Sequence, residues 1–178
     1  MNIHQMQVRY QPGADRILWQ VRTAGGELFQ AWLTRRLMKL AWPHLNRMVL
    51  HAGLAQVLPG ATPASVLPEA QDMLAQAVRD RPLANARFNE PFITQSVAKP
   101  LGEAPLLADA IDLGPGAAGR GLNLRLREES GRSMALQLND DLATALVRLL
   151  NQALLESDWG LTEPVAKAPP TEAPRVLN

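Results

Sequence analysis

The side chains of this 178-residue chain that could perform acid–base, nucleophilic or metal chemistry are few and scattered. There is no cysteine, which excludes disulfides, thiolate nucleophiles and cysteine-based zinc sites. The histidines are His4, His44 and His51, and the separation of seven positions between the last two corresponds to about 10 Å along a helix, too far for one zinc ion. Asp109 and Asp112 lie three apart in an expected strand, so they point to opposite faces and form no acid–base pair.

Motifs that commonly mark enzymes are missing as well. No GxSxG, HExxH, P-loop or GxGxxG sequence stands in its required context. We therefore predict a non-enzymatic protein with no catalytic residue, no metal site, no cofactor and no evident small-molecule substrate. An enzyme whose site is assembled from scattered residues is the remaining alternative.

Two short segments resemble each other except in charge. Residues 33–37 read Leu-Thr-Arg-Arg-Leu, and residues 138–142 read Leu-Asn-Asp-Asp-Leu. Each follows a strand-like segment and opens a helix-like one. Thr34 and Asn139 stand where a side-chain oxygen can accept a hydrogen bond from a free backbone N–H, so both are predicted helix caps.

The charges that follow these caps differ in their fit to a helix start. Asp140 and Asp141 suit the positive end of the helix dipole, whereas Arg35 and Arg36 are each disfavoured by roughly 0.3–1 kcal/mol. Three arrangements would accommodate the arginines. They could pair with the two aspartates, hold an external anion together with Thr34, or lie in solvent at small cost.

Apolar periodicity predicts the elements that position these residues. Alternating apolar residues predict three strands within residues 6–33, followed by a helix interrupted by Pro43, which should kink it or divide it in two. A strand over 107–113 and two within 122–138 precede a second helix. The expected buried stripes are Leu37, Leu40, Ala41, His44, Leu45 and Met48 in the first helix, and Leu142, Ala145, Leu146, Leu149, Leu150, Ala153 and Leu154 in the second.

These elements form a repeat. A shift of 105 residues aligns 16–50 with 121–155 and superimposes turn, strand face, cap and helix stripe. We predict an α+β fold of two tandem βββα units, an internal duplication with a pseudo-twofold axis, in which antiparallel sheets pack on helices and an inserted helix lies between the units.

The predicted domain organisation follows from this repeat. Residues 1–160 form a single pseudo-symmetric domain, with unit one at 3–53, an insert at 54–104 and unit two at 105–160. Four prolines from Pro164 onward predict a disordered, Pro-rich tail over 161–178.

The outward face of the first sheet is unusually apolar. Leu18, Leu28 and Trp32 alternate with the core residues of their strands, although an antiparallel sheet with one wet face should be polar there. Something is expected to cover this face. The candidates are the chain's own residues 69–97, a partner protein or a second copy, which makes the three residues a candidate protein interface.

Charge is distributed unevenly along the chain. Residues 1–60 contain seven Lys or Arg and two acidic residues, so they carry +5 of a net charge of +1 and the remainder carries −4. A nucleic-acid or anion site is therefore a second candidate, with Trp32 or Tyr10 as a stacking surface. Its expected residues are Arg22, Thr34, Arg35, Arg36 and Lys39, together with Arg9 and Arg16.

The predicted function rests on these surfaces. The layout of duplicated sheet-plus-helix units is similar to that of PUR repeat and Whirly proteins, although three strands per unit are evident here where those families have four; the resemblance implies single-stranded nucleic-acid binding. Neither a secretion signal nor a run of 18 apolar residues is present, so a cytoplasmic protein without a membrane partner is expected. We predict an adaptor or regulatory protein that acts through protein–protein or self-association surfaces, with single-stranded nucleic-acid binding by the basic N-terminal unit as the alternative.

Overall fold

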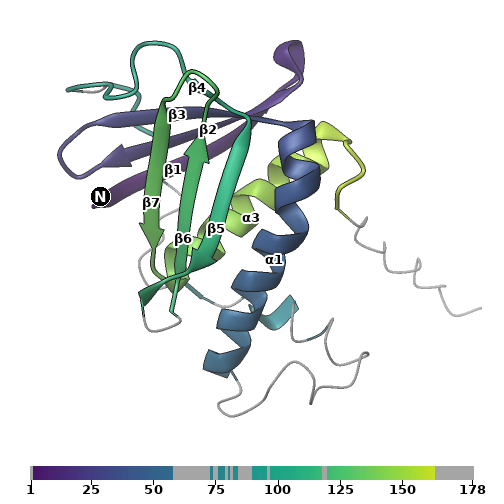
Figure 1. Cartoon of the computed structure of the whole chain (residues 1–178). Coiled ribbons are helices and arrows are strands. Elements are labelled where there is room, and N and C mark those ends of the chain that lie inside the picture. The colour runs from purple at the N-terminus through teal and green to yellow at the C-terminus, as the bar shows by residue number, and fades with distance from the viewer. Residues whose placement is uncertain are drawn as a thin grey trace, which may run out of the picture.

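The computed structural model describes residues 2–57, 73, 76–78, 80, 82–83, 90–95, 97–117 and 120–162. Within these residues the chain forms two sheets packed against helices, an α+β architecture (Figure 1). The elements are β1 (Ile3–Gln11), β2 (Arg16–Thr23), β3 (Leu28–Thr34), α1 (Arg35–Val57), β4 (Leu106–Ala108), β5 (Ala110–Pro115), β6 (Leu122–Arg127), β7 (Ser133–Leu138) and α3 (Asp140–Ser157).

The two sheets have the strand orders β1-β2-β3-β4 and β5-β6-β7. All neighbouring strands are antiparallel except β3 and β4, which are parallel. The alternation predicted in the first sheet is correct, because Ile17 pairs with Leu33 and Trp19 with Ala31 on the buried face. In Figure 1 the strands of the second sheet run across the direction of those in the first.

One segment belongs to both sheets. The single strand predicted over 107–113 is instead divided into β4 and β5 at Asp109, whose N–H donates to Arg127 O at 3.0 Å. Leu106 and Ala108 are buried beside β3, whereas the residues after Asp109 pair with β6. The prediction of one strand was wrong because alternation does not reveal a bend at which a strand changes partners.

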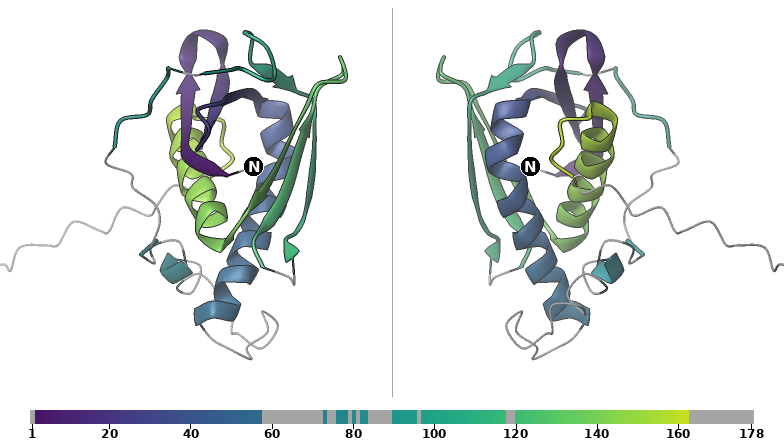
Figure 2. Two further views of the ribbon diagram at one scale, coloured as in Figure 1. Left: turned by 90° about the vertical axis from the view of Figure 1, so that its left-hand side faces the viewer. Right: turned by 90° about the vertical axis from the view of Figure 1, so that its right-hand side faces the viewer.

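Each helix packs on the sheet of the other half of the chain. Helix α1 follows β3 yet packs against β5, and α3 follows β7 yet lies along β1 (Figure 2). The two helices also contact each other. Buried residues of both sheets and both helices consequently form one hydrophobic core, and neither half of the chain buries its apolar face alone.

Both predicted caps are confirmed. The Thr34 hydroxyl accepts from Leu37 N at 3.2 Å, and Asn139 Oδ1 accepts from Leu142 N at 2.9 Å. Each bond satisfies one of the backbone donors that a helix start leaves unpaired.

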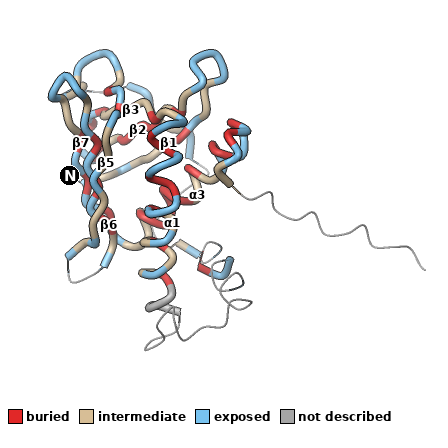
Figure 3. The backbone as a smooth tube through the Cα atoms, turned by 45° about the vertical axis from the view of Figure 1, so that its right-hand side comes forward, coloured by how far each residue is buried: buried red, intermediate tan, exposed pale blue. Residues whose placement is uncertain are grey.

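Helix α1 continues through Pro43 as a single element, so the predicted division into two helices is wrong. Pro43 lies on the exposed side of α1, where water can bond to the Lys39 carbonyl that loses its helical partner. One side of α1 is buried, as the red stretches of its tube in Figure 3 show. This side centres on Met38 and Leu45, which are 2% and 1% exposed.

Two residues of the predicted α1 stripe are exposed. Leu40 retains 66% of its surface, and His44 is exposed rather than a partly buried structural histidine. Both lie outside the face centred on Met38 and Leu45, because successive helical residues are about 100° apart. Trp42 instead packs in the core, at 7% exposure.

Several predictions fall largely on residues outside the described part. The predicted tail lies outside it from residue 163 onward. Of the predicted inserted helix, residues 73, 76–78 and 80 are described, and they are helical. Val78 is fully buried beside Gly53 of α1, where an added Cβ would lie 2.2 Å from the Val78 side chain. No helix of the described residues is long and apolar enough to cross a membrane.

The shared core predicts that one truncation in α3 destabilises both halves together. Leu146 is 0% exposed, so Leu146→Ala should lower the free energy of unfolding by about 2–5 kcal/mol. Leu155→Ala on the same helix, at 45% exposure, is the matched control and should cost less than about 1 kcal/mol. Urea unfolding followed by tryptophan fluorescence and circular dichroism should give one coincident transition; two separated transitions in Leu146→Ala would contradict the shared core.

Candidate functional site

The first strand of the chain leaves one edge open. In the described residues β1 has β2 on one side and no strand on the other, so alternate backbone N–H and C=O groups point away from the sheet. Its core-facing residues are apolar, with Val8 at 9% exposure and Met6 half-buried, while Gln7 and Arg9 face outward. An open edge of this length can pair with another extended chain.

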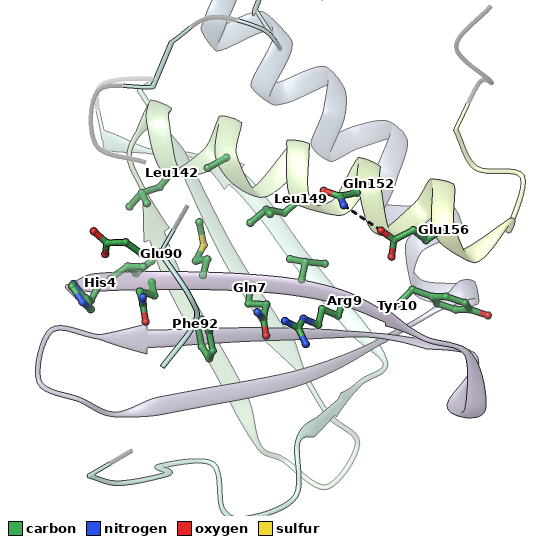
Figure 4. Close-up of a pocket in the computed structure, with 15 residues that line it drawn as sticks. His4, Gln7, Arg9, Tyr10, Glu90, Phe92, Leu142, Leu149, Gln152 and Glu156 are labelled. Atoms are coloured by element: carbon green, nitrogen blue, oxygen red, sulfur yellow. Dashed lines mark hydrogen bonds between the residues drawn. The ribbon is translucent and has the colours of Figure 1, made fainter. Parts of the chain in front are cut away.

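Helix α3 forms a second wall alongside this edge. Leu142, Ala145, Leu149, Gln152 and Glu156 follow each other at spacings of three and four residues and line the same groove as β1. Leu142 and Leu149 are only half-buried, which leaves apolar surface open to an occupant. We call this space the β1–α3 groove; its volume is 730 Å³ (Figure 4).

A clamp from β1 holds the mouth of the groove. Gln5 Nε2 donates to Pro91 O at 3.2 Å, and Gln5 Oε1 accepts from Ile93 N at 3.1 Å. The amide thereby binds both backbone neighbours of Phe92, whose half-buried ring lines the groove together with Glu90. These two bonds hold the Phe92 ring in place at the lining of the groove.

The groove has a carboxylate near each end, Glu90 at one and Glu156 at the other, and we call the Glu156 end, where an amide also lies, the polar end. Figure 4 shows Leu142 above His4 and Glu90, and Glu156 above Tyr10. Gln152 donates to Glu156 at 3.2 Å, so the polar end carries a carboxylate on an ordered amide.

The polar end is fixed by a group that we call the Asp15 cluster. Asp15 Oδ1 accepts from the Tyr10 hydroxyl at 2.9 Å and from Trp159 Nε1 at 2.8 Å, while the two rings meet edge to face with centroids 5.8 Å apart. Arg35 Nη2 donates to Trp159 O at 3.3 Å. The cluster joins the β1–β2 turn to the end of α3 and the start of α1.

Hydrogen bonding determines the ionisation of this cluster. The bonds from Trp159 and then Tyr10 lower the pKa of Asp15. Desolvation opposes them with a smaller effect, and the nearby Arg35 charge adds a still smaller lowering. Its bond to Asp15 raises the pKa of Tyr10. Two donors hold the Asp15 carboxylate in its charged form, so it acts as a structural hydrogen-bond acceptor. The cluster contains no nucleophile or general base that the carboxylate could activate.

Arg35 therefore has a different partner from the one expected. In the described residues neither Arg35 nor Arg36 bonds to Asp140 or Asp141, and Asp140 Oδ1 accepts from Gly121 N at 2.6 Å. Arg35 lies beside the C-terminal end of α3, whereas Asp140 begins that 18-residue helix, about 27 Å away. Direct pairing across a pseudo-twofold axis is excluded by this separation.

The outward face of the first sheet is partly covered by the chain itself. Arg22 donates to Gln95 O, and Leu28 N donates to Ala98 O at 2.9 Å, so the segment before β4 crosses this end of the face. Leu28 is 3% exposed, so it cannot contribute to the candidate protein interface. Leu18 and Trp32 pair with each other and stay half-buried, beside Leu107 at 38% exposure.

The predicted anion-binding residues do not converge. Arg22 is bonded to the segment at Gln95, the Thr34 hydroxyl caps α1, and Arg35 belongs to the Asp15 cluster. Arg36 and Lys39 are exposed on α1.

A second ionic cluster joins β4 and the segment before it to the β6–β7 turn. Arg132 donates to Glu128 from Nε at 2.5 Å and from Nη2 at 2.7 Å, and Leu107 N donates to the same carboxylate at 2.8 Å. These bonds, together with one from Ser130, lower the pKa of Glu128 to about 2. Arg132 Nη1 also donates to Leu101 O at 2.8 Å, so this pair is structural as well.

Known proteins give no further guidance. No protein-family model, curated protein or solved structure matches the chain. In the described residues no three His, Asp or Glu side chains lie close enough to hold a metal ion. The similarity to PUR repeat and Whirly proteins thus gains no support from these comparisons.

The β1–α3 groove was not predicted from the sequence. One signal was present: the apolar stripe predicted for α3 spans about half of the helix circumference, wider than one packing face requires. The open edge of β1 had no local signal, because strand order is set by the whole topology.

The Asp15 cluster predicts a specific loss of stability in acid. Because the folded pKa of Asp15 lies below its ordinary value, the stabilisation is complete above about pH 4 and is lost as the pH falls through the folded pKa. Asp15→Asn keeps the side-chain size and tolerates the backbone φ of 46°, but removes the charge. Urea midpoints measured from neutral to acidic pH should fall more steeply in the unaltered protein than in Asp15→Asn; parallel curves would show that the cluster contributes nothing.

Proposed function

We propose that this protein is a non-enzymatic cytoplasmic adaptor or regulatory protein, and that the β1–α3 groove is its principal protein-binding site. The observation that carries the proposal is an open strand edge facing half-buried Leu142 and Leu149 across 730 Å³ of space. Ligand sites of roughly 300–1,000 Å³ are common, so the size alone selects no ligand class.

The shape of the groove favours an extended segment over a compact ligand. Ile3 to Tyr10 line it without a gap, a distance of about 23 Å in a strand. The α3 wall from Leu142 to Glu156 is of similar length, about 21 Å. An added strand would bond to the β1 backbone and direct alternate side chains onto the helix.

Side-chain chemistry suggests what that segment carries. Apolar residues would contact Leu142 and Leu149, and a Lys or Arg would meet Glu156 at the polar end. Phe92 supplies an aromatic contact at the mouth. The occupant is thus an extended protein segment with alternating apolar residues and a basic residue near one or both ends, where Glu90 and Glu156 lie.

Self-association is the other form of this proposal. The β1 strand of a second copy could pair antiparallel with this one, centred on Gln7 of both copies. Arg9 of each copy would then lie opposite Gln5 of the other, so that no like charges would be adjacent. Leu18, Trp32 and Leu107 would then serve as a further contact surface.

We also infer that the fold arose by tandem duplication of a βββα unit with a pseudo-twofold relation. Both halves contain three antiparallel strands followed by a capped helix, and each helix packs on the sheet of the other half. A reciprocal exchange of this kind is expected when two copies of one unit complete each other's cores.

Single-stranded nucleic-acid binding is the second candidate function. It is supported by the exposure of Arg9, Arg36 and Lys39, although these lie on separate elements. Tyr10 is already occupied by the Asp15 cluster. Binding to a labelled single strand at about 50 mM salt, weakening steeply as salt rises, would support this function.

A peptide-selection experiment tests the groove. Short random peptides displayed on phage and panned against the full chain should yield sequences that alternate apolar and polar residues. Leu149→Asp should weaken the selected peptides by about tenfold or more, because it places an unpaired carboxylate against their apolar side chains. Bound peptide should slow hydrogen exchange at β1 amides.

Leu155→Asp supplies the matched control, since Leu155 lies on α3 but does not line the groove. Equal binding by the two variants, or no enrichment, would reject the groove as the site. Sedimentation of the protein alone separates the two occupants: a dimer that Leu149→Asp dissociates would assign the groove to a second copy.

A further inference from the structure

Helix α1 presents a strongly basic surface to solvent. Its 23 residues contain no Asp or Glu, and Arg36, Lys39, His44, Arg47 and His51 are all exposed. We call this surface the cationic face of α1. Two of its arginines frame a short apolar row, because Arg36, Leu40, Pro43 and Arg47 follow at spacings of four, three and four residues along one side of the helix.

The charges on this face lack partners in the described part of the chain. No hydrogen bond or ion pair there joins Arg36, Lys39 or Arg47 to another residue. Elsewhere two arginines form ion pairs, Arg127 with Asp112 at 3.0 Å and Arg132 with Glu128 at 2.5 Å. Arg36 also lies in the first turn of α1, where the helix dipole disfavours a positive charge. The face thus keeps cations that no described residue neutralises.

An exposed leucine lies among these cations. Leu40 retains 66% of its surface and stands one turn from Arg36. Contact with an apolar partner would remove that surface from water, whereas a neighbouring carboxylate would pair with the arginine. The arrangement therefore combines an apolar contact with two flanking charges about 16 Å apart along the helix axis.

We propose that the cationic face of α1 binds an acidic amphipathic helix of a protein partner. The partner helix carries apolar residues that pack on Leu40 and Pro43, and a carboxylate beyond each end of that apolar pair meets Arg36 and Arg47. This surface is separate from the β1–α3 groove, so the protein has two sites of different chemistry and can hold two partners together.

The same cations could meet nucleic-acid phosphates, but the rest of the face fits that ligand less well. A phosphate backbone offers no apolar group to Leu40, and single-strand binding sites stack bases on exposed aromatic rings. The aromatic residue of α1 is Trp42, which is 7% exposed and packs in the core. Charge and apolar surface together select an acidic helix.

Two synthetic probes test the proposal. The first is a labelled helical peptide with Leu at two positions three apart and Glu four residues outside each; the second replaces both Glu by Gln. Fluorescence anisotropy with the full chain should show that the Glu peptide binds at least about tenfold more tightly than the Gln peptide, with affinity that falls as salt rises. Equal binding of the two peptides, or none, would overturn the proposal.

Variants of exposed residues locate the site and identify the ligand class. Arg36→Gln combined with Arg47→Gln should weaken the Glu peptide by about tenfold or more, while Arg125→Gln, an exposed arginine on β6, should not. Leu40→Gln should weaken the peptide severalfold. The same variants should be tested with a labelled single-stranded oligonucleotide. Tighter binding than that of the peptide, lost in the Arg36 and Arg47 variant but unchanged by Leu40→Gln, would overturn the proposal in favour of a nucleic-acid site. Leu149→Asp should leave peptide binding unchanged, because it alters only the groove.

Discussion

The exchange of helices between the two sheets is the constraint on which the rest of this structure depends. Each sheet has an apolar face that needs cover, and the helix next in sequence covers the other sheet instead. Both halves therefore share one core, in which fully buried residues such as Trp19 of the first sheet and Leu126 of the second belong to one cluster with residues of α1 and α3. Moving either helix would therefore open the core that both sheets share.

The position of α3 under β1 also creates the groove. Core packing buries Leu146, Leu150 and Leu154, yet the apolar stripe of α3 is wider than this face and continues to Leu142 and Leu149. The Asp15 cluster ties the far end of α3 to the turn after β1, and Gln5 fixes the segment at Phe92. Because three sides are held by independent contacts, the groove is formed before any ligand arrives, which reduces the entropic cost of binding.

The strands, caps and face pairings could be predicted because they depend on neighbours in sequence. Alternation placed Leu18 and Trp32 on one face, and the residue types at Thr34 and Asn139 identified two helix starts. The division of β4 from β5, the open edge of β1 and the exposure of Leu40 depend instead on contacts between distant segments. Periodicity shows which residues share a face of an element, but not which element covers it. The groove was missed for this reason.

The reversed charges at the two helix starts follow from the same exchange. Helix α1 begins beside the C-terminal end of α3, where Arg35 meets the Trp159 carbonyl and the Asp15 carboxylate, so a positive charge disfavoured by its own helix is stabilised by its neighbours. Helix α3 begins beside the β5–β6 loop, where Asp140 accepts a bond from Gly121 N and suits its own helix dipole. The two helix starts thus face different surroundings, which explains opposite charges at Arg35 and Asp140. Arg36 has no such partner among the described residues.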